Sequence, residues 1–249
     1  MNIIKDSQMK NMFSTKFEVL TNDVDMFKEI KISALFAFMV ETAFKHVKSY
    51  GLGHETEESE NIWVLSTMEL EVYEKIKWQD IIEVKTWPRL QEGLFFYRDF
   101  EIISEAGETL AVASSSWLFI NKNLRLPDRK ALRELDIKCL DKSVLSRNPK
   151  RMTAIENTKQ IEKFKANYNN FDFHQHVNNS VYIDWIFNTY SKEYHIANKL
   201  TSIQIDFIQE ITNMEEVSIL KFDTENLHYF EGKLLETDKT CFRALLKWK

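Results

Sequence analysis

The chain has 249 residues, of which 44% are hydrophobic, and its formal net charge is −5. This composition is typical of a globular protein, and the length allows one large domain or two of roughly 100–125 residues. The acidic balance gives no reason to expect a nucleic-acid partner, and the glycine motifs that bind nucleotide phosphates do not occur. The sequence therefore predicts no nucleotide cofactor.

Two features of the sequence indicate the compartment. Its two cysteines, Cys139 and Cys241, lie far apart, which is typical of proteins in a reducing cytosol. The first residues contain no apolar signal segment, and no stretch approaches the ~18 apolar residues of a membrane span. We therefore expect a cytoplasmic protein that makes no membrane contact.

The first half predicts a strand, a long helix and an antiparallel meander, in that order. The helix is expected from residue 32, because apolar residues recur every three or four positions over four turns, and Gly51 is expected to end it. Strands are expected at residues 62–73, 81–87, 94–103 and 110–120. The apolar helix positions are Ile32, Leu35, Phe36, Met39, Val40, Ala43, Phe44 and Val47.

Residues 121–163, between the halves, are charged and weakly periodic. Pro127 and Asp128 predict the start of a short helix over residues 129–135. The later part of the segment is basic, through Lys142, Arg147, Lys150 and Arg151. A solvated linker is the plainer interpretation, and a docking surface for an acidic partner is the alternative.

The second half repeats the order of the first. A helix is expected after residues 178–180, followed by strands at residues 201–208, 217–222, 227–235 and 240–248. The pairs at an offset of 147 (164 − 17) are Phe17 with Phe164, Asp25 with Asp172, and Ser33 with Ser180. Several matches at one offset indicate a duplication. We expect an α+β protein with one unit at 1–121, a linker at 122–160 and a second unit at 161–249. In each unit a long helix is expected to be wrapped by an antiparallel sheet.

A polar cluster precedes the second helix. Its members are Asp172, His174, His176, Asn178 and Asn179. The start of a helix presents backbone N–H groups and the positive end of the helix dipole, which stabilise a developing oxyanion. A histidine there is able to move a proton near neutral pH. Helix capping and turn formation are the plainer roles for Asp and Asn at such a place.

The duplication provides an internal comparison for this cluster. At the offset of 147, the first copy has different residues at the aligned positions: Phe27, Glu29, Lys31 and Ile32 stand where the second copy has His174, His176, Asn178 and Asn179. If these residues served only the fold, the first copy would need similar ones. Glu210, at a predicted strand end, faces Lys75 at a second offset of 135 (210 − 75), and a solvated carboxylate is its plainer role. The comparison favours a functional role for the cluster of the second copy.

These residues resemble the acyl–acyl carrier protein (ACP) thioesterases. The helix-start motif of that family is approximately D-x-N-x-H-V-N-N, and this chain supplies Asp172, His176, Val177, Asn178 and Asn179 in register. Residues 41–47, 62–64 and 107–117 are also similar to the family, so the resemblance covers nearly the whole chain. It implies a tandem hot-dog fold that hydrolyses fatty acyl-ACP to free fatty acid, with the carrier protein as partner.

The resemblance also implies a mechanism, direct attack of water on the thioester. Glu210, which falls where the family carries a glutamate, acts as general base or positions the water. His176 hydrogen-bonds the water or the thioester, and Asp172 orients the site. The oxyanion is held at residues 177–179.

Two positions depart from the family pattern. His174 stands in place of an asparagine, and it retains one donor and one acceptor on separate nitrogens. Ile211 stands where plant members carry a cysteine, so no cysteine nucleophile is expected there. For the first unit the family suggests acyl-chain binding, with Phe36, Met39 and Trp63 as candidates, although core packing is their plainer role.

Other functions stay open. An acyl-CoA thioesterase would share the fold and the reaction, a hot-dog dehydratase or hydratase would leave the thioester intact, and an acyl-binding module would do no chemistry. A metal site at His174 and His176 is a poor match, because no further ligands accompany them. We expect no metal or other cofactor, and both a monomer and a homodimer are compatible with the sequence.

Overall fold

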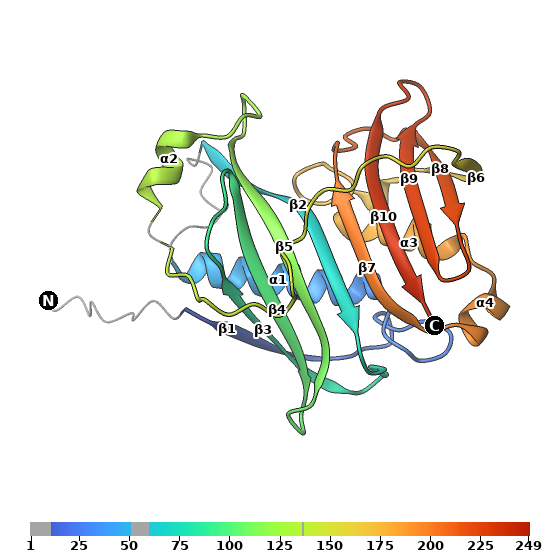
Figure 1. The fold of residues 1–249 in the computed structure, drawn as a ribbon, viewed down its shortest axis with the longest axis horizontal. Helices are drawn as coiled ribbons and strands as arrows, with labels where there is room; N and C mark the ends of the chain where they lie inside the picture. The colour runs from blue at the N-terminus through green and yellow to red at the C-terminus, as the bar shows by residue number, and fades with distance from the viewer. Residues whose placement is uncertain (1–10, 51–59, 136) are drawn as a thin grey trace, which may run out of the picture.

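The computed structural model describes residues 11–50, 60–135 and 137–249 (Figure 1). The first half contains β1 (Phe13–Glu18), α1 (Ile32–Ser49), β2 (Asn61–Val72), β3 (Ile81–Pro88), β4 (Phe95–Ser104) and β5 (Thr109–Asn121). A short helix, α2 (Arg129–Glu134), lies between the halves. The second half contains β6 (Lys159–Lys165), the 3-10 turn η1 (Tyr168–Asn170), α3 (Asn179–Asn188), α4 (Lys192–Ala197), β7 (Leu200–Phe207), β8 (Glu216–Asp223), β9 (Leu227–Leu234) and β10 (Thr240–Trp248).

Within these residues, ten strands form one antiparallel sheet in the order β1-β3-β4-β5-β2-β7-β10-β9-β8-β6. The two halves meet at its centre, where β2 pairs with β7 (Figure 1). The five strands of each half have the same order from the outer edge of the sheet to its centre: the first strand along the chain, then the third, the fourth, the fifth and the second. The duplication predicted from the sequence is therefore confirmed in the topology.

The pairing of the strands places a two-fold axis at the join. Glu69 in β2 pairs with Gln204 in β7, and these two residues are separated by the same 135 positions (204 − 69) that relate the halves in sequence. A residue that pairs with its own counterpart lies on the axis that relates the copies. The irregularities repeat as well, because Trp117 and Trp248 each follow a bulge in the ladder.

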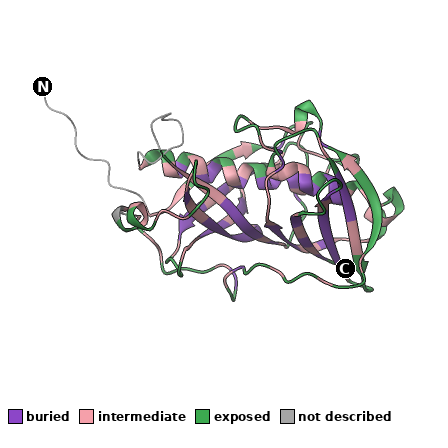
Figure 2. Cartoon of the chain, turned by 90° about the horizontal axis from the view of Figure 1, so that it is seen from above, coloured by how far each residue is buried: buried purple, intermediate pink, exposed green. Residues whose placement is uncertain are grey.

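The helices cover one face of the sheet, with α1 against α3 (Figures 1 and 2). The apolar stripe predicted for α1 is buried, including Leu35, Phe36, Met39 and Ala43. Burial of each large apolar side chain contributes roughly 1.5–3 kcal/mol, so this contact is a main source of stability for the fold. A long helix wrapped by an antiparallel sheet in each half is the tandem hot-dog arrangement.

The helices differ from the prediction in the second half. α3 has 10 residues where α1 has 18, and a separate helix, α4, follows it. The break has a local cause, since the Ser191 hydroxyl accepts the backbone N–H of Tyr194 at 3.1 Å and starts a new helix. In the first half α1 ends at Ser49, and Gly51, expected to end it, lies outside the described residues.

The segment between the halves crosses the face of the sheet opposite to the helices (Figure 2). It is tied down by two buried carboxylates: Asp99 accepts the N–H of Val144 at 2.9 Å, and Asp206 accepts that of Met152 at 2.5 Å. Burial raises the pKa of both carboxyl groups, against the lowering effect of these hydrogen bonds. The connecting segment is largely exposed, and these two hydrogen bonds anchor it to the sheet.

The described residues include no helix that is both long enough and apolar enough to cross a membrane.

Candidate active site

The loop before α3 is built around the Asp172 carboxylate. Its Oδ1 accepts the backbone N–H of His174 at 2.9 Å and that of His176 at 3.4 Å. The N–H of Asp172 donates to the carbonyl of His176 at 2.9 Å, which closes the turn. Gln175 completes it with a φ of +62°, in the left-handed region. Asp172 thus fixes the backbone that carries both histidines.

The first copy builds the same turn with Asp25. The Oδ1 of Asp25 accepts the N–H of Phe27 at 2.8 Å and that of Glu29 at 3.1 Å, and Lys28 has a φ of +61°. A residue kept with the same bonds in both copies serves the loop itself. The structure therefore supports an orienting role for Asp172.

His176 and Glu210 lie together at the start of α3. The His176 Nδ1 and the Glu210 Oε1 are 3.5 Å apart, and the two side chains are 27% and 31% exposed. Glu210 follows the end of β7, so the pair joins the loop before α3 to the exit of a central strand. The separation is at the long end for a hydrogen bond, as in many sites that tighten only on binding substrate.

Arg125 also contacts Glu210, and no pattern in the sequence indicated this residue. It comes from the turn after β5, where its N–H donates to the carbonyl of Asn121 at 2.8 Å and its φ is +55°. Its guanidinium forms an ion pair with the Glu210 Oε2. Because that oxygen is held by Arg125, Oε1 is the oxygen that faces His176. The segment that follows the first unit thus contributes one residue to the site of the second.

The predicted oxyanion donors need a correction. The N–H of Val177 donates to the carbonyl of Ile211 at 2.9 Å, and that of Asn178 donates to Asn170 at 2.8 Å. Both bonds hold the loop against its neighbours, so these two backbone groups are already engaged. The Asn178 Oδ1 accepts from the N–H and hydroxyl of Ser180, at 2.9 and 2.8 Å, which leaves its Nδ2 as a donor.

His174 lies at the rim of this loop. Its side chain is exposed, and its ring centroid is 4.0 Å from that of Phe173, which is itself 80% exposed. Of the predicted residues, His176 and Glu210 are thus in direct contact, Asp172 fixes their loop, and His174 faces solvent.

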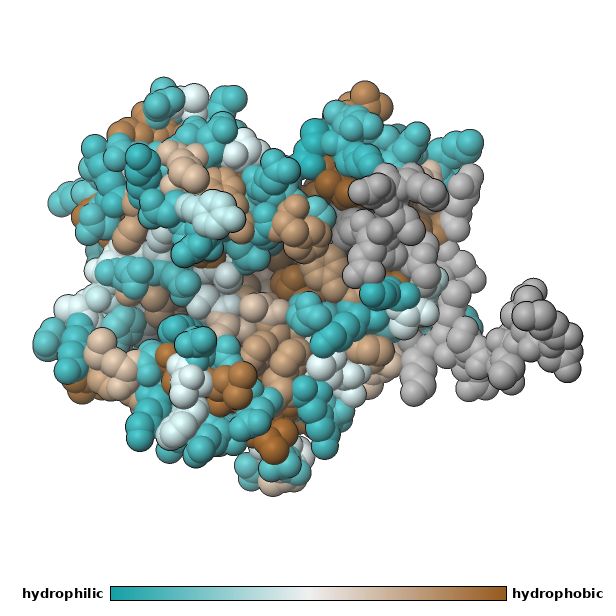
Figure 3. All heavy atoms as spheres, turned by 180° about the vertical axis from the view of Figure 1, so that it is seen from behind, coloured by the Kyte–Doolittle hydropathy of each residue, from teal (hydrophilic) through white to brown (hydrophobic). Residues whose placement is uncertain are grey.

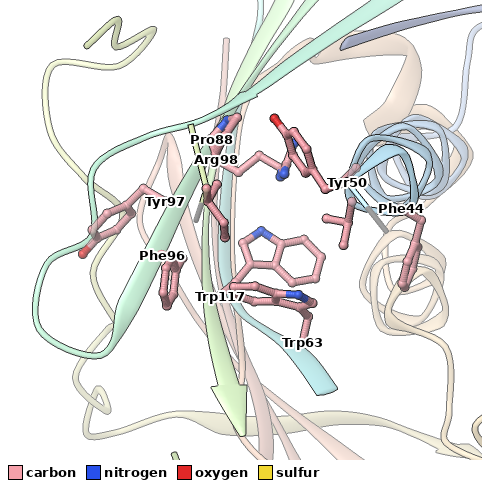
Figure 4. A pocket seen from close by; sticks show the side chains of 11 residues that line it. Phe44, Tyr50, Trp63, Pro88, Phe96, Tyr97, Arg98 and Trp117 are labelled. Atoms are coloured by element: carbon pink, nitrogen blue, oxygen red, sulfur yellow. The ribbon is translucent and has the colours of Figure 1, made fainter. Parts of the chain in front are cut away.

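An apolar pocket lies in the first half (Figure 4). It encloses about 590 Å³ including its open mouth, between the C-terminal end of α1 and strands β2, β4 and β5. Side chains that line it include Ala43, Val47, Trp63, Phe96, Arg98 and Trp117. Of the three residues considered for acyl binding, Trp63 lines the pocket, whereas Phe36 and Met39 are fully buried core residues. Figure 3, from the helix side, shows apolar residues gathered in a hollow with hydrophilic rims.

The pocket and the His176–Glu210 pair share one end of the molecule. β2 pairs antiparallel with β7, so the start of β2, where Trp63 lies, is at the same edge as the exit of β7 toward Glu210. One buried cation, Arg98, reaches into this pocket and donates to Thr86 at 3.2 Å. Burial lowers the pKa of Arg98 to about 10, which still keeps it charged at neutral pH.

The described residues offer neither an activated thiol nor a metal cluster. Burial raises the pKa of the Cys241 thiol to about 12 and also raises that of Cys139, which makes both poor nucleophiles. Ile211, in place of a family cysteine, is fully buried. No group of three or more His, Cys, Asp or Glu side chains among the described residues is close enough to hold a metal ion.

The fold and the site together define a tandem hot-dog protein with a histidine–glutamate pair beside an apolar pocket. Residues 10–131 match the acyl-ACP thioesterase N-terminal domain, and residues 153–248 match the acyl-ACP thioesterase C-terminal domain. The chain belongs to the acyl-ACP thioesterase family.

Individual relatives agree with this assignment. The chain is 27% identical over 216 residues to acyl-[acyl-carrier-protein] hydrolase FATB2 of Cuphea viscosissima, covering 80% of this chain and 52% of that protein. It is 25% identical over 222 residues to oleoyl-acyl carrier protein thioesterase 2 of Arabidopsis thaliana, covering 80% and 59%. The chain thus spans little more than half the length of these curated relatives.

Two solved structures share the fold. An acyl-ACP thioesterase of Bacteroides thetaiotaomicron superposes with a TM-score of 0.87 at 23% identity, over 96% of this chain and 98% of that one. The 12:0-ACP thioesterase of Umbellularia californica superposes with a TM-score of 0.81 at 20% identity, over the same shares. Both superpositions extend over the two halves, so the tandem arrangement is a property of the fold.

Proposed function

We propose that this protein hydrolyses the thioester of fatty acyl-ACP, releasing a free fatty acid and the carrier thiol. The observation that carries the proposal is the His176–Glu210 pair, which lies at the same end of the sheet as an apolar pocket. A carboxylate next to a histidine suits the activation of water, and the pocket suits an alkyl chain. The names of the relatives supply the substrate class.

In the proposed mechanism, water attacks the thioester carbon and Glu210 takes its proton. His176 hydrogen-bonds the water or the thioester oxygen, and Arg125 holds the second oxygen of Glu210 in place. The tetrahedral intermediate then collapses with cleavage of the carbon–sulfur bond, and the proton taken from water passes to the departing sulfur. No covalent acyl-enzyme forms.

The oxyanion of this intermediate needs donors near the start of α3. Asn179 occupies the first position of that helix, where a backbone N–H has no partner within the helix, and Asn178 contributes its Nδ2. A correctly placed donor of this kind contributes roughly 10²–10³ in rate, and a general base roughly 10²–10⁴. The proposal therefore places the oxyanion at Asn178 and Asn179 and leaves Val177 as a core residue.

The pocket of the first half is proposed to take the acyl chain. Its lining is mostly aromatic and aliphatic, as in sites that bind apolar ligands. The first unit then determines which chain lengths fit, while the second performs the reaction. The cytoplasm remains the proposed compartment, supported by two free cysteines.

The test is thiol release from a panel of acyl-ACPs and matched acyl-CoAs. We expect rapid release from carrier-bound chains and slow release from CoA. Equal rates on both carriers would favour an acyl-CoA thioesterase. Tight binding of acyl chains without thiol release, in a folded sample, would favour an acyl-binding module and contradict the proposal.

A further inference from the structure

The segment of residues 122–133, after β5, combines positive charge with exposed apolar side chains. Its cations are Lys122, Arg125, Arg129, Lys130 and Arg133, all of them exposed. Leu124 and Leu126, on either side of Arg125, are 70% and 62% exposed. Large apolar side chains this exposed, among like charges, are typical of a surface that meets a partner.

The charges of the three cations of α2 are not neutralised by neighbouring carboxylates within the described part of the chain. Among the described residues, no ion pair is formed by Arg129, Lys130 or Arg133. The start of the helix is capped, because the Asp128 carboxylate accepts the N–H of Lys130 and that of Ala131, each at 3.0 Å. The segment therefore presents fixed positive charge to solvent.

The other basic stretch, at residues 142–151, is arranged differently. Lys142 lies 3.4 Å from Glu101 and over the Trp87 ring, and Arg147 lies 3.7 Å from Glu69. Arg151 donates to the hydroxyl of Ser66 and to a backbone carbonyl of β7. These three cations therefore have partners on the sheet, whereas the cations of α2 form no ion pair among the described residues, and this difference favours α2 as the surface that meets a partner.

The segment of residues 122–133 is also joined to the active site. Arg125 comes from its tight turn and forms the ion pair with Glu210. At the other end of the turn, Asp128 accepts from the side chain of Asn61 at 3.3 Å, which ties the segment to the start of β2, two residues before the pocket residue Trp63. A partner that binds here is held beside both the reacting pair and the pocket.

We propose that residues 122–133 form the docking surface for the carrier protein, which binds through an acidic face. This inference rests on the proposed function, because it takes the acyl chain to be delivered on an acidic carrier. Charge complementarity selects this segment over residues 142–151, and the exposed leucines supply the apolar part of the contact. Arg125 makes the surface continuous with the site.

The test measures carrier binding and hydrolysis separately. The variant reverses the charge of α2 through Arg129→Glu, Lys130→Glu and Arg133→Glu; the first two lie in the first turn of the helix, where an acidic side chain is favourable. The matched control reverses three exposed lysines of the edge strand β6, through Lys159→Glu, Lys163→Glu and Lys165→Glu. The ligand is a palmitoyl carrier protein in which an amide replaces the thioester, so that binding is read without turnover.

We expect the dissociation constant of this carrier to rise about tenfold or more in the α2 variant, and to change less than about twofold in the control. Hydrolysis of a small palmitoyl thioester that lacks the carrier should stay within about twofold of wild type in both proteins. Equal weakening by both variants, unchanged binding in the α2 variant, or no carrier binding by wild type would overturn the docking proposal. Carrier binding with this pattern, but no thiol release from any thioester, would overturn the proposed function and leave the docking surface in place.

Discussion

The two helix-start loops have the same backbone and different side chains. Each is closed by an aspartate with the same two N–H contacts, and each has a residue of positive φ at the same position. In the second half the loop brings His176 to Glu210. In the first half the same two positions hold Glu29 and Lys75, which form an ion pair with one another.

This difference separates what the fold requires from what the chemistry requires. The turn aspartate is present in both copies and is needed wherever the loop is built. The His176–Glu210 pair is replaced in the first copy by Glu29 and Lys75, which hold the loop to the end of β2 but pair the carboxylate with a lysine and not with a histidine. Both copies thus retain a contact between the loop and the strand end, and the second copy alone has the His–Glu pair that is proposed to activate water.

The pocket lies in the first half, which lacks the histidine–glutamate pair, and the second half, as far as the structure describes it, has no equivalent open space at the matching tryptophan. In the first half Trp117 lines an open pocket. Its counterpart Trp248, at an offset of 131 (248 − 117), donates to the hydroxyl of Tyr190 at 3.2 Å, and that hydroxyl is 2.8 Å from the Nδ1 of His228. Stacked aromatic side chains fill this part of the second half. One unit therefore keeps the space and the other keeps the reacting pair.

The largest effect is expected from paired substitutions at the two loops. His176→Ala should lower kcat on acyl-ACP by about 10²–10⁴, because it removes the partner of the water or the thioester. Glu29→Ala, at the matching position, should leave kcat within about twofold. Circular dichroism and thermal melting of both variants would establish that they fold. A similar loss of kcat in both variants would contradict the comparison. It would show that the contact between the loop and the strand end, and not the chemistry of the histidine, determines activity.

A smaller effect is expected from filling the pocket. Ala43 faces Tyr190 at the offset of 147, so Ala43→Tyr places in the first half the side chain that helps to fill the second. We expect kcat/KM for the longest accepted chains to fall about tenfold, with less effect on short chains, because the tyrosine occupies volume that the chain needs. A chain-length panel of acyl-ACPs measures this. Unchanged chain-length preference in a folded variant would contradict acyl binding in this pocket.

The turn aspartates should behave alike in stability and differently in activity. Asp25→Asn and Asp172→Asn each weaken two hydrogen bonds from backbone N–H groups, so each should lower the free energy of unfolding by about 1–2 kcal/mol. Denaturant titration measures both. Asp172→Asn should also lower kcat, since it loosens the loop that holds His176. A large stability loss in one variant alone would show that the loops are not equivalent.

The smallest effect concerns the anchor of the connecting segment. The pKa of Asp206 is raised by burial above its usual value of 3.8, so the folded state binds the proton more tightly than the unfolded state. Its contribution to stability is therefore greatest at low pH and declines as the pH rises through the raised pKa. Asp206→Asn should remove this decline. The melting temperature of the variant, relative to that of wild type, should therefore rise as the pH increases from about 4 to about 7. A constant difference across that range would contradict the direction of the shift.

Much of the fold follows from local patterns. The α1 stripe and the alternation in β4 and β10 predicted those elements to within one or two residues, because each pattern reflects a single buried face. The second helix was harder, since its break at residues 189–191 depends on one serine cap. The anchors of the connecting segment were not predicted for a different reason. The backbone N–H groups of Val144 and Met152 donate to Asp99 and Asp206 from distant strands, and no local pattern records such partners.

The site was predictable in part. His176 stood out because the duplication supplied a control copy that lacks it. Arg125 was missed because it belongs to the connecting segment and contacts Glu210 only through the tertiary fold. The oxyanion donors were assigned too broadly for a similar reason. Whether a backbone N–H at a helix start is available depends on neighbours such as Asn170 and Ile211, whose carbonyls already accept from this loop.

The most direct test of the account is thiol release from acyl-ACP by Glu210→Gln and Lys75→Gln, measured side by side with wild type. The two substitutions remove the charges of two residues that occupy equivalent positions in the two copies. The account predicts that wild type and Lys75→Gln release thiol at similar rates, and that Glu210→Gln is slower by about 10²–10⁴. Full activity in a folded Glu210→Gln protein, or an equal loss in Lys75→Gln, would contradict the claim that the second copy alone carries the chemistry.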